Sequence, residues 1–161
     1  VDAGSATPSS DAATPPSDTG IDPGAIFNFA PESAAQSTAK RSDFEKMSTT
    51  FKNAILAAGK AYKDITGRKI TLASTYRSQA DQDRLYNTWV GAGGNLQTKP
   101  TAAGITTPAK QVGSHGGVAI DAGAQAEEIS RTIDLARFGL RWGGTFSKPD
   151  AVHIQLANAS Q

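Results

Sequence analysis

The clearest pattern along the chain is a helical repeat of apolar residues between positions 42 and 66. Ser42 and Glu45 have the spacing of a capping box, and Gly67 follows the repeat, so we expect one helix that begins near Ser42 and ends at Gly67. The apolar residues recur at intervals of three or four, which places them on one face. They are Met47, Phe51, Ile55, Ala58, Tyr62 and Ile65.

Shorter patterns follow this helix. Strands are predicted at 69–76, 117–122, 140–142 and 152–156, and a second helix is predicted at 78–89. A third helix at 124–138 would turn Ile129, Ile133 and Ala136 inward and end at Gly139. Helices that alternate with short strands favour the α+β class, here a small antiparallel sheet packed with helices in a single domain.

Two segments lack such periodicity. Residues 1–24 consist mostly of Ser, Thr, Ala, Pro, Asp and Gly, so we interpret 1–40 as a flexible or disordered N-terminal tail and 41–161 as the domain. Within the tail, Phe27 and Phe29 lie in an apolar stretch, expected to lie along the domain surface or to dock to a partner. Residues 91–110 predict a long loop that faces substrate as a lid.

Composition narrows the classes of function. The chain has 161 residues, no cysteine and a net charge of +1, and its lysines and arginines are scattered, which is atypical of a nucleic-acid-binding protein. No apolar run approaches the ~20 residues that span a bilayer, so membrane insertion is not expected. The chain begins at Val1, which is typical of a processed product or of a piece of a longer protein.

Candidate chemistry gathers around the two histidines of the chain. His115, Asp121 and His153 would form a three-ligand zinc site, at which a water molecule would have its pKa lowered toward neutrality. Asp150 would act as the general base, and Arg77 would stabilise an oxyanion. A metal site here must use histidine and carboxylate ligands, because the chain has no thiolate.

Structural alternatives exist for each of these residues. A single histidine is usually a surface or hydrogen-bonded core residue, although two histidines near carboxylates in glycine-flanked segments favour a metal site. Arg77 suits a salt bridge, and Asp150 suits the turn after Pro149. Trp142 suits either a core position before a turn or a wall of a substrate site.

Four sequence blocks in order carry a resemblance to a known family. They are STYRS at 74–78, GVAID at 117–121, GLRWGGTF at 139–146 and DAVHIQL at 150–156. Together they resemble the zinc D,D-carboxypeptidases and L-alanyl-D-glutamate endopeptidases, which cut the peptide stems of bacterial peptidoglycan and include phage endolysins. The resemblance covers roughly residues 42–156.

The resemblance implies a fold like that of the D-Ala-D-Ala peptidases and hedgehog domains. It also implies Zn²⁺ held by His115, Asp121 and His153, with Asp150 as the base and Arg77 near the substrate. Substrate contacts are expected from Trp142, Tyr76 and Ser114. Aspartate at position 150 and the Trp-Gly-Gly sequence favour cleavage of the L-Ala/D-Glu bond.

One spacing departs from the family pattern. His115 and Asp121 are six residues apart, whereas the corresponding positions of the family are seven residues apart. Six residues of strand span about 20 Å, which is too far for two ligands of one ion, so the backbone must bend between them. Gly116 and Gly117 can supply that bend because glycine accepts positive φ at little cost.

The leading hypothesis is a zinc peptidase that acts on peptidoglycan outside the cell. A phage virion or tail protein would fit, with the tail segment contacting other virion proteins. A second hypothesis is a catalytically weakened or inactive domain of the same fold that binds cell wall or protein. The third is an α+β structural domain whose histidines hold no metal.

Overall fold

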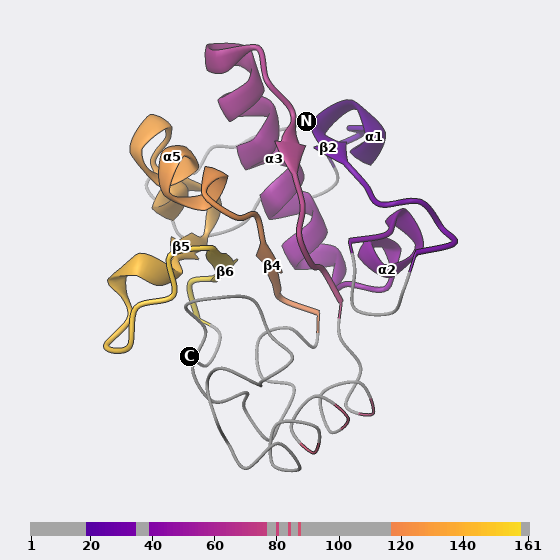
Figure 1. Ribbon diagram of the computed structural model, residues 1–161. Coiled ribbons are helices and arrows are strands. Elements are labelled where there is room, and N and C mark those ends of the chain that lie inside the picture. Colours follow the sequence, from indigo (N-terminus) through magenta and orange to yellow (C-terminus); the bar gives the residue numbers. More distant parts are fainter. Residues whose placement is uncertain are drawn as a thin grey trace.

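The computed structural model describes residues 19–34, 39–76 and 117–158, together with Ala80, Arg84 and Asn87. Its α-helices are α1 (Pro23–Ile26), α2 (Arg41–Glu45), α3 (Thr49–Thr66) and α5 (Gln125–Thr132). The strands are β2 (Phe27–Asn28), β3 (Ile70–Thr71), β4 (Ala119–Asp121), β5 (Leu140–Trp142) and β6 (His153–Leu156). Two 3-10 helices, η2 (Leu135–Phe138) and η3 (Gly143–Thr145), complete the described elements. The class is α+β (Figure 1).

A three-stranded antiparallel sheet forms the C-terminal half of the domain. Its strand order is β4-β6-β5, so β6 is paired on both sides. Asp121 lies opposite His153 on one side, and Trp142 lies opposite Ile154 on the other. The predicted antiparallel sheet is confirmed, although β4 begins at Ala119 rather than Gly117. Gly117 has a φ of 132°, which shows that the backbone turns sharply just before the strand.

The long helix α3 begins six residues later than the sequence predicts. Ser48 is its N-cap, and the Ser48 Oγ accepts a hydrogen bond from the Phe51 amide at 3.1 Å. The capping box predicted at Ser42 is wrong. Ser42 lies inside α2, a separate short helix that precedes α3, and its hydroxyl donates a hydrogen bond to the Glu32 carboxylate. The predicted end is confirmed at Gly67, which has a φ of 74°.

Most of the predicted apolar face of α3 is buried. Phe51, Ile55, Ala58 and Tyr62 are each 0% exposed. Ile65 is the exception at 65% exposed, because the last turn of α3 extends beyond the elements that cover the rest of the helix (Figure 1). The helical repeat therefore identifies the buried face but overestimates its length.

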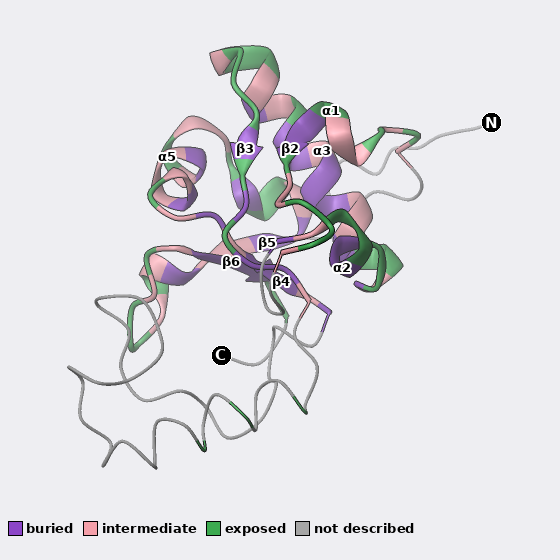
Figure 2. Ribbon diagram, turned by 45° about the vertical axis from the view of Figure 1, so that its right-hand side comes forward, coloured by how far each residue is buried: buried purple, intermediate pink, exposed green. Residues whose placement is uncertain are grey.

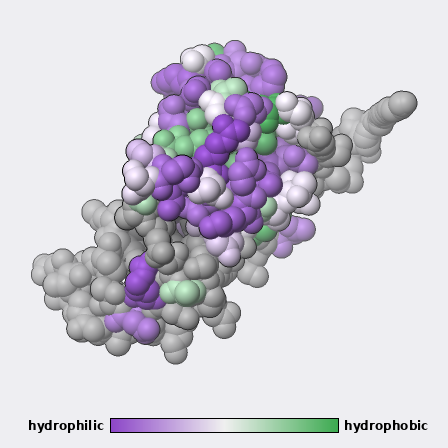
Figure 3. Space-filling view, turned by 90° about the vertical axis from the view of Figure 1, so that its right-hand side faces the viewer, coloured by the Kyte–Doolittle hydropathy of each residue, from purple (hydrophilic) through white to green (hydrophobic). Residues whose placement is uncertain are grey.

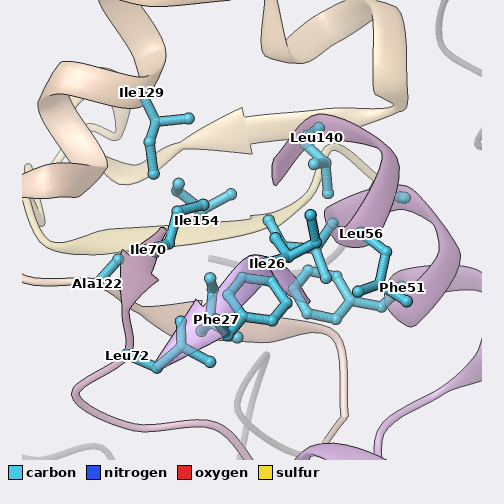
Figure 4. Packing of buried hydrophobic residues seen from close by; sticks show 14 of the residues in the cluster. Ile26, Phe27, Phe51, Leu56, Ile70, Leu72, Ala122, Ile129, Leu140 and Ile154 are labelled. Atoms are coloured by element: carbon cyan, nitrogen blue, oxygen red, sulfur yellow. The ribbon is translucent and has the colours of Figure 1, made fainter. Parts of the chain in front are cut away.

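The stretch around Phe27 packs inside the domain rather than along its surface. Ile26 and Phe27 are 3% and 1% exposed, and β2 pairs in parallel with β3. A Cβ on Gly59 would lie 2.4 Å from the Ile26 Cγ2, so the glycine in α3 makes room for this segment. Figure 4 shows Ile26 and Phe27 among the core residues. The surface position expected from the sequence is therefore wrong for these two residues, while the tail boundary at residue 40 stays a prediction.

The helix predicted at 124–138 is divided in two. Helix α5 ends at Thr132, Ile133 is extended with a φ of −130°, and η2 follows. Ile129 is buried as predicted and Ile133 is half-buried, but Ala136 is exposed and Leu135 is buried in its place. Because the chain is extended at Ile133 and Asp134, the helical register is interrupted there, and Leu135 rather than Ala136 faces the core.

One hydrophobic core runs through the elements described so far. Figure 2 shows buried residues along α3, β2, β3 and the central strand β6. The face shown in Figure 3 is mostly hydrophilic where it is coloured, with small hydrophobic patches. Among the described residues, no helix combines the length and apolar character needed to cross a membrane. The predicted helix at 78–89, apart from three helical positions, and the loop at 91–110 lie outside the described residues.

Candidate metal centre

The antiparallel register of β4 and β6 brings Asp121 and His153 together. Directly paired residues of neighbouring strands point to the same face of the sheet. The His153 Nδ1 lies 3.3 Å from the Asp121 Oδ1. The Ser74 hydroxyl donates to the other carboxylate oxygen of Asp121 at 3.1 Å, which helps to fix the orientation of that side chain. Asp121 and His153 therefore form a pre-arranged pair.

Asp150 joins this pair from the turn that precedes β6. Its Oδ2 lies 3.8 Å from the His153 Nδ1, and its carbonyl oxygen accepts a hydrogen bond from the His153 amide at 3.2 Å. The side chains differ in exposure, with 4% for His153, 17% for Asp121 and 47% for Asp150. The arrangement therefore runs from a buried imidazole to a carboxylate at the surface.

These three residues could hold a metal ion. One ligand atom from each lies within 4.8 Å of the other two. Two ligands bound tetrahedrally at about 2.1 Å from one zinc ion would be about 3.4 Å apart. The 3.3 Å separation of the Asp121 and His153 atoms fits that geometry. An imidazole nitrogen with carboxylate oxygens also suits zinc and other divalent transition metals.

The Trp-Gly-Gly sequence shapes the turn that carries Asp150. The Asp150 amide donates to the Gly143 carbonyl at 2.9 Å, and a Cβ on Gly143 would lie 2.3 Å from the Asp150 carbonyl oxygen. The Trp142 indole donates to the Ala151 carbonyl at 2.9 Å. A Cβ on Gly144 would collide with the Trp142 ring at 2.3 Å. Gly143 is thus required for close packing against Asp150, and Gly144 for close packing against the Trp142 ring.

Opposing effects act on the His153 imidazole. Burial lowers the pKa of His153, but hydrogen bonds with Asp121 and Gln155 and the negative charges of Asp121 and Asp150 raise it, and the net pKa lies above the usual 6.5. The Phe146 ring packs edge-on against the imidazole, with centroids 5.6 Å apart. The His153 ring therefore contacts Gln155 and Phe146 and lies beside the carboxylates of Asp121 and Asp150.

Comparisons with known proteins give one structural likeness to report. No known family model and no curated protein matches this chain. The structure aligns with that of the Serratia marcescens L-Ala D-Glu endopeptidase ChiX over 81% of this chain and 90% of that chain, with 19% sequence identity and a TM-score of 0.43.

The structure places some of the predicted site residues. Asp121, Asp150 and His153 are brought together, and Trp142 lies against the same turn. Tyr76 is partly buried, with the Lys46 Nζ 5.9 Å from the centre of its ring. The substrate contacts of Tyr76 and Trp142 stay predictions. Ser114, His115 and Arg77, like Gly116, lie outside the described residues.

Two residues of the site were not predicted. Ser74 binds the carboxylate of Asp121, and Gln155 binds the imidazole of His153. Gln155 had a usable signal, because residues two apart on a strand share a face and Gln155 follows His153 by two. Ser74 had none, because its contact with Asp121 joins positions far apart in the sequence.

Proposed function

We propose that this protein is a zinc-dependent peptidase that hydrolyses an amide bond in peptidoglycan stem peptides. The observation that carries the proposal is the convergence of Asp121, His153 and Asp150, whose ligand atoms lie within 4.8 Å of one another. The four sequence blocks support the substrate class. The L-Ala/D-Glu bond is the expected target, because the Trp-Gly-Gly sequence and the aspartate at position 150 resemble those of the endopeptidases.

Asp121 and His153 are the residues that would hold the ion. They are the two less exposed members of the set, and the Asp121 oxygen lies closer to the His153 Nδ1 than the Asp150 oxygen does. His115 is proposed as the third protein ligand, which would complete the set that catalytic zinc sites usually have. When bound, the metal would polarise the scissile carbonyl and lower the pKa of a water molecule.

Asp150 is assigned a different role from Asp121. Its side chain is about half exposed, and its carboxylate lies farther from the imidazole. It sits on a turn that Gly143 anchors, beside the ligands but on the solvent side. A carboxylate in this position can accept a proton from the attacking water and pass it to the leaving amine. Arg77 is proposed to stabilise the negative charge that develops on the substrate carbonyl oxygen.

The test combines metal analysis with digestion of purified sacculi. The wild-type protein is expected to bind about one zinc ion per chain and to release new amino termini from sacculi. Asp150→Asn should keep the metal and lower activity by about 10²-fold or more, whereas His153→Ala should lose the metal. Asp64→Asn is the matched control, because Asp64 is an exposed carboxylate on α3 that pairs with Lys60.

Three results would contradict the proposal in different ways. A protein that takes up no zinc after reconstitution would exclude the metal site. Bound zinc without release of amino termini, and no effect of Asp150→Asn, would instead favour a cell-wall or protein binding module of the same fold. Release of termini other than D-glutamate would keep the peptidase and change the bond.

The place of action follows from the proposed substrate. An enzyme that cuts peptidoglycan must reach the cell wall, so we propose that it acts outside the cytoplasm. A phage origin, a virion or tail location and contacts of the N-terminal tail, residues 1–40, with other virion proteins stay predictions from the sequence.

A further inference from the structure

Gln155 is a polar residue in a position that favours an apolar one. It is 0% exposed and lies in the central strand β6, opposite Ala119 on one side and Arg141 on the other. Its neighbours Ile154 and Leu156 are also buried. A buried amide is costly unless its polar atoms are hydrogen-bonded. The presence of glutamine here therefore calls for a polar partner, and His153 supplies one.

The hydrogen bond between these side chains has a defined direction. The Gln155 Oε1 lies 2.8 Å from the His153 Nε2. An amide oxygen only accepts hydrogen bonds, so the imidazole Nε2–H is the donor. The other ring nitrogen, Nδ1, faces the carboxylates of Asp121 and Asp150 at 3.3 and 3.8 Å. The two nitrogens of His153 thus have separate surroundings, one an amide oxygen and the other the candidate metal site.

We propose that Gln155 is a positioning residue that keeps the proton of His153 on Nε2 and presents Nδ1 to the metal ion. The inference rests on the proposed function, because it assigns a role toward the zinc ion. Histidines that bind metals commonly donate their second N–H to a nearby acceptor, which fixes the ring orientation. Here the acceptor lies on the same strand as the ligand, so the backbone of β6 sets both positions together.

The geometry distinguishes this role from simple filling of the core. The contact is a hydrogen bond of ordinary length to the ring nitrogen remote from the carboxylates. The Phe146 ring packs edge-on against the imidazole but offers it no acceptor of comparable strength. A side chain of the same volume without an acceptor should therefore fill the space of Gln155 and still lose its effect on His153.

Gln155→Met tests this directly, with Gln155→Glu as the variant that keeps an acceptor oxygen. Zinc affinity is measured by competition with a chelator. Gln155→Met should weaken zinc binding by about 10- to 100-fold, and Gln155→Glu should restore much of the loss. Gln125→Met is the matched control, because the Gln125 amide is hydrogen-bonded too, but it joins α5 to the backbone of Lys69 and Thr71. It should lower thermal stability and leave zinc affinity unchanged.

A second readout requires no metal. Nitrogen-15 NMR of the metal-free protein should show a His153 Nε2–H that exchanges slowly with solvent in the wild type and fast in Gln155→Met. The chain has two histidines, so His115→Ala assigns the signals. Equal zinc affinity in the wild type and Gln155→Met, or Nε2–H exchange that the substitution does not change, would overturn the role of Gln155. Lack of zinc binding by the wild type would overturn the proposed function, whatever the exchange rates show.

Discussion

Gly143 is the residue on which the position of the Asp150 turn depends. Its carbonyl accepts the Asp150 amide hydrogen bond, and its α-carbon faces the Asp150 carbonyl and the His153 Cβ. The sequence shows a glycine pair after a tryptophan, which also suits an ordinary turn. Only the packed structure shows that one glycine makes room for the segment of Asp150 and His153 and that the other makes room for the Trp142 ring.

Gly143→Ala is therefore expected to displace the turn. The added Cβ would lie 2.3 Å from the Asp150 carbonyl oxygen and 3.0 Å from the His153 Cβ, so backbone must move. We expect a loss of about 1–3 kcal/mol in the free energy of unfolding, together with weaker zinc binding, measured by denaturant titration and chelator competition. Gly67→Ala is the control, since a Cβ there meets no atom within 4 Å and strain arises only from its φ of 74°. Wild-type zinc affinity in Gly143→Ala would show that the turn does not position the ligands.

At the scale of elements, the sequence predicts which face of a helix is buried better than it predicts the residue at which the helix begins. The repeat from Phe51 to Tyr62 correctly identifies the buried face of α3, because a 3.6-residue period is local information. The start of the helix was misplaced because two serines, Ser42 and Ser48, both have the chemistry of an N-cap. The Ser48 amide donates a hydrogen bond to the Gly117 carbonyl. This contact between distant segments holds the N-cap residue of α3 in place, and the sequence alone does not show it.

The cap assignment gives a prediction that separates the two serines. Ser48→Ala should lower the free energy of unfolding by about 1 kcal/mol, because it removes the acceptor for the Phe51 amide at the start of α3. Ser42→Ala should cost less, because its hydroxyl bonds the exposed side chain of Glu32. Thermal or urea unfolding of both variants checks this, and a larger effect at Ser42 would contradict the observed cap.

A polar cluster joins α3, the segment before β3, and α5. The Glu128 carboxylate accepts hydrogen bonds from the Tyr62 hydroxyl and from Arg68, and these interactions lower the pKa of Glu128 from 4.5. Because the pKa is lower in the folded state, this stabilisation is present above about pH 4.5 and is lost as pH falls through the folded pKa.

Glu128→Gln should accordingly make the free energy of unfolding less dependent on pH in the acid range. Urea unfolding at a series of pH values below 5 measures the slope. Glu127→Gln is the matched control, since Glu127 pairs with Arg131 within α5 and does not contact the cluster. Equal slopes in wild type and Glu128→Gln would show that the cluster contributes nothing to the acid sensitivity.

For the molecule as a whole, the sequence predicts the α+β class, the antiparallel strands near Trp142 and His153, and the convergence of Asp121, Asp150 and His153. These follow from local alternation and from motif spacing. It does not predict that Phe27 pairs its strand with Ile70, because nothing local marks a two-residue strand whose partner lies 43 positions away. Gln155 was missed for a different reason: its spacing of two from His153 was a usable signal, but its polarity suggested a surface position, whereas all four residues of β6 are buried.

The parallel pairing of β2 with β3 bears on how fragments of this chain are made. A fragment that starts at residue 41, the domain boundary expected from the sequence, lacks Ile26 and Phe27, and Phe27 is the backbone partner of Ile70. It leaves a hollow in front of Gly59 and removes Phe27 and Phe29, the two rings that pack against Phe44. In fragments and fusion proteins, the joining point therefore belongs before α1, so that Ile26 and Phe27 are kept.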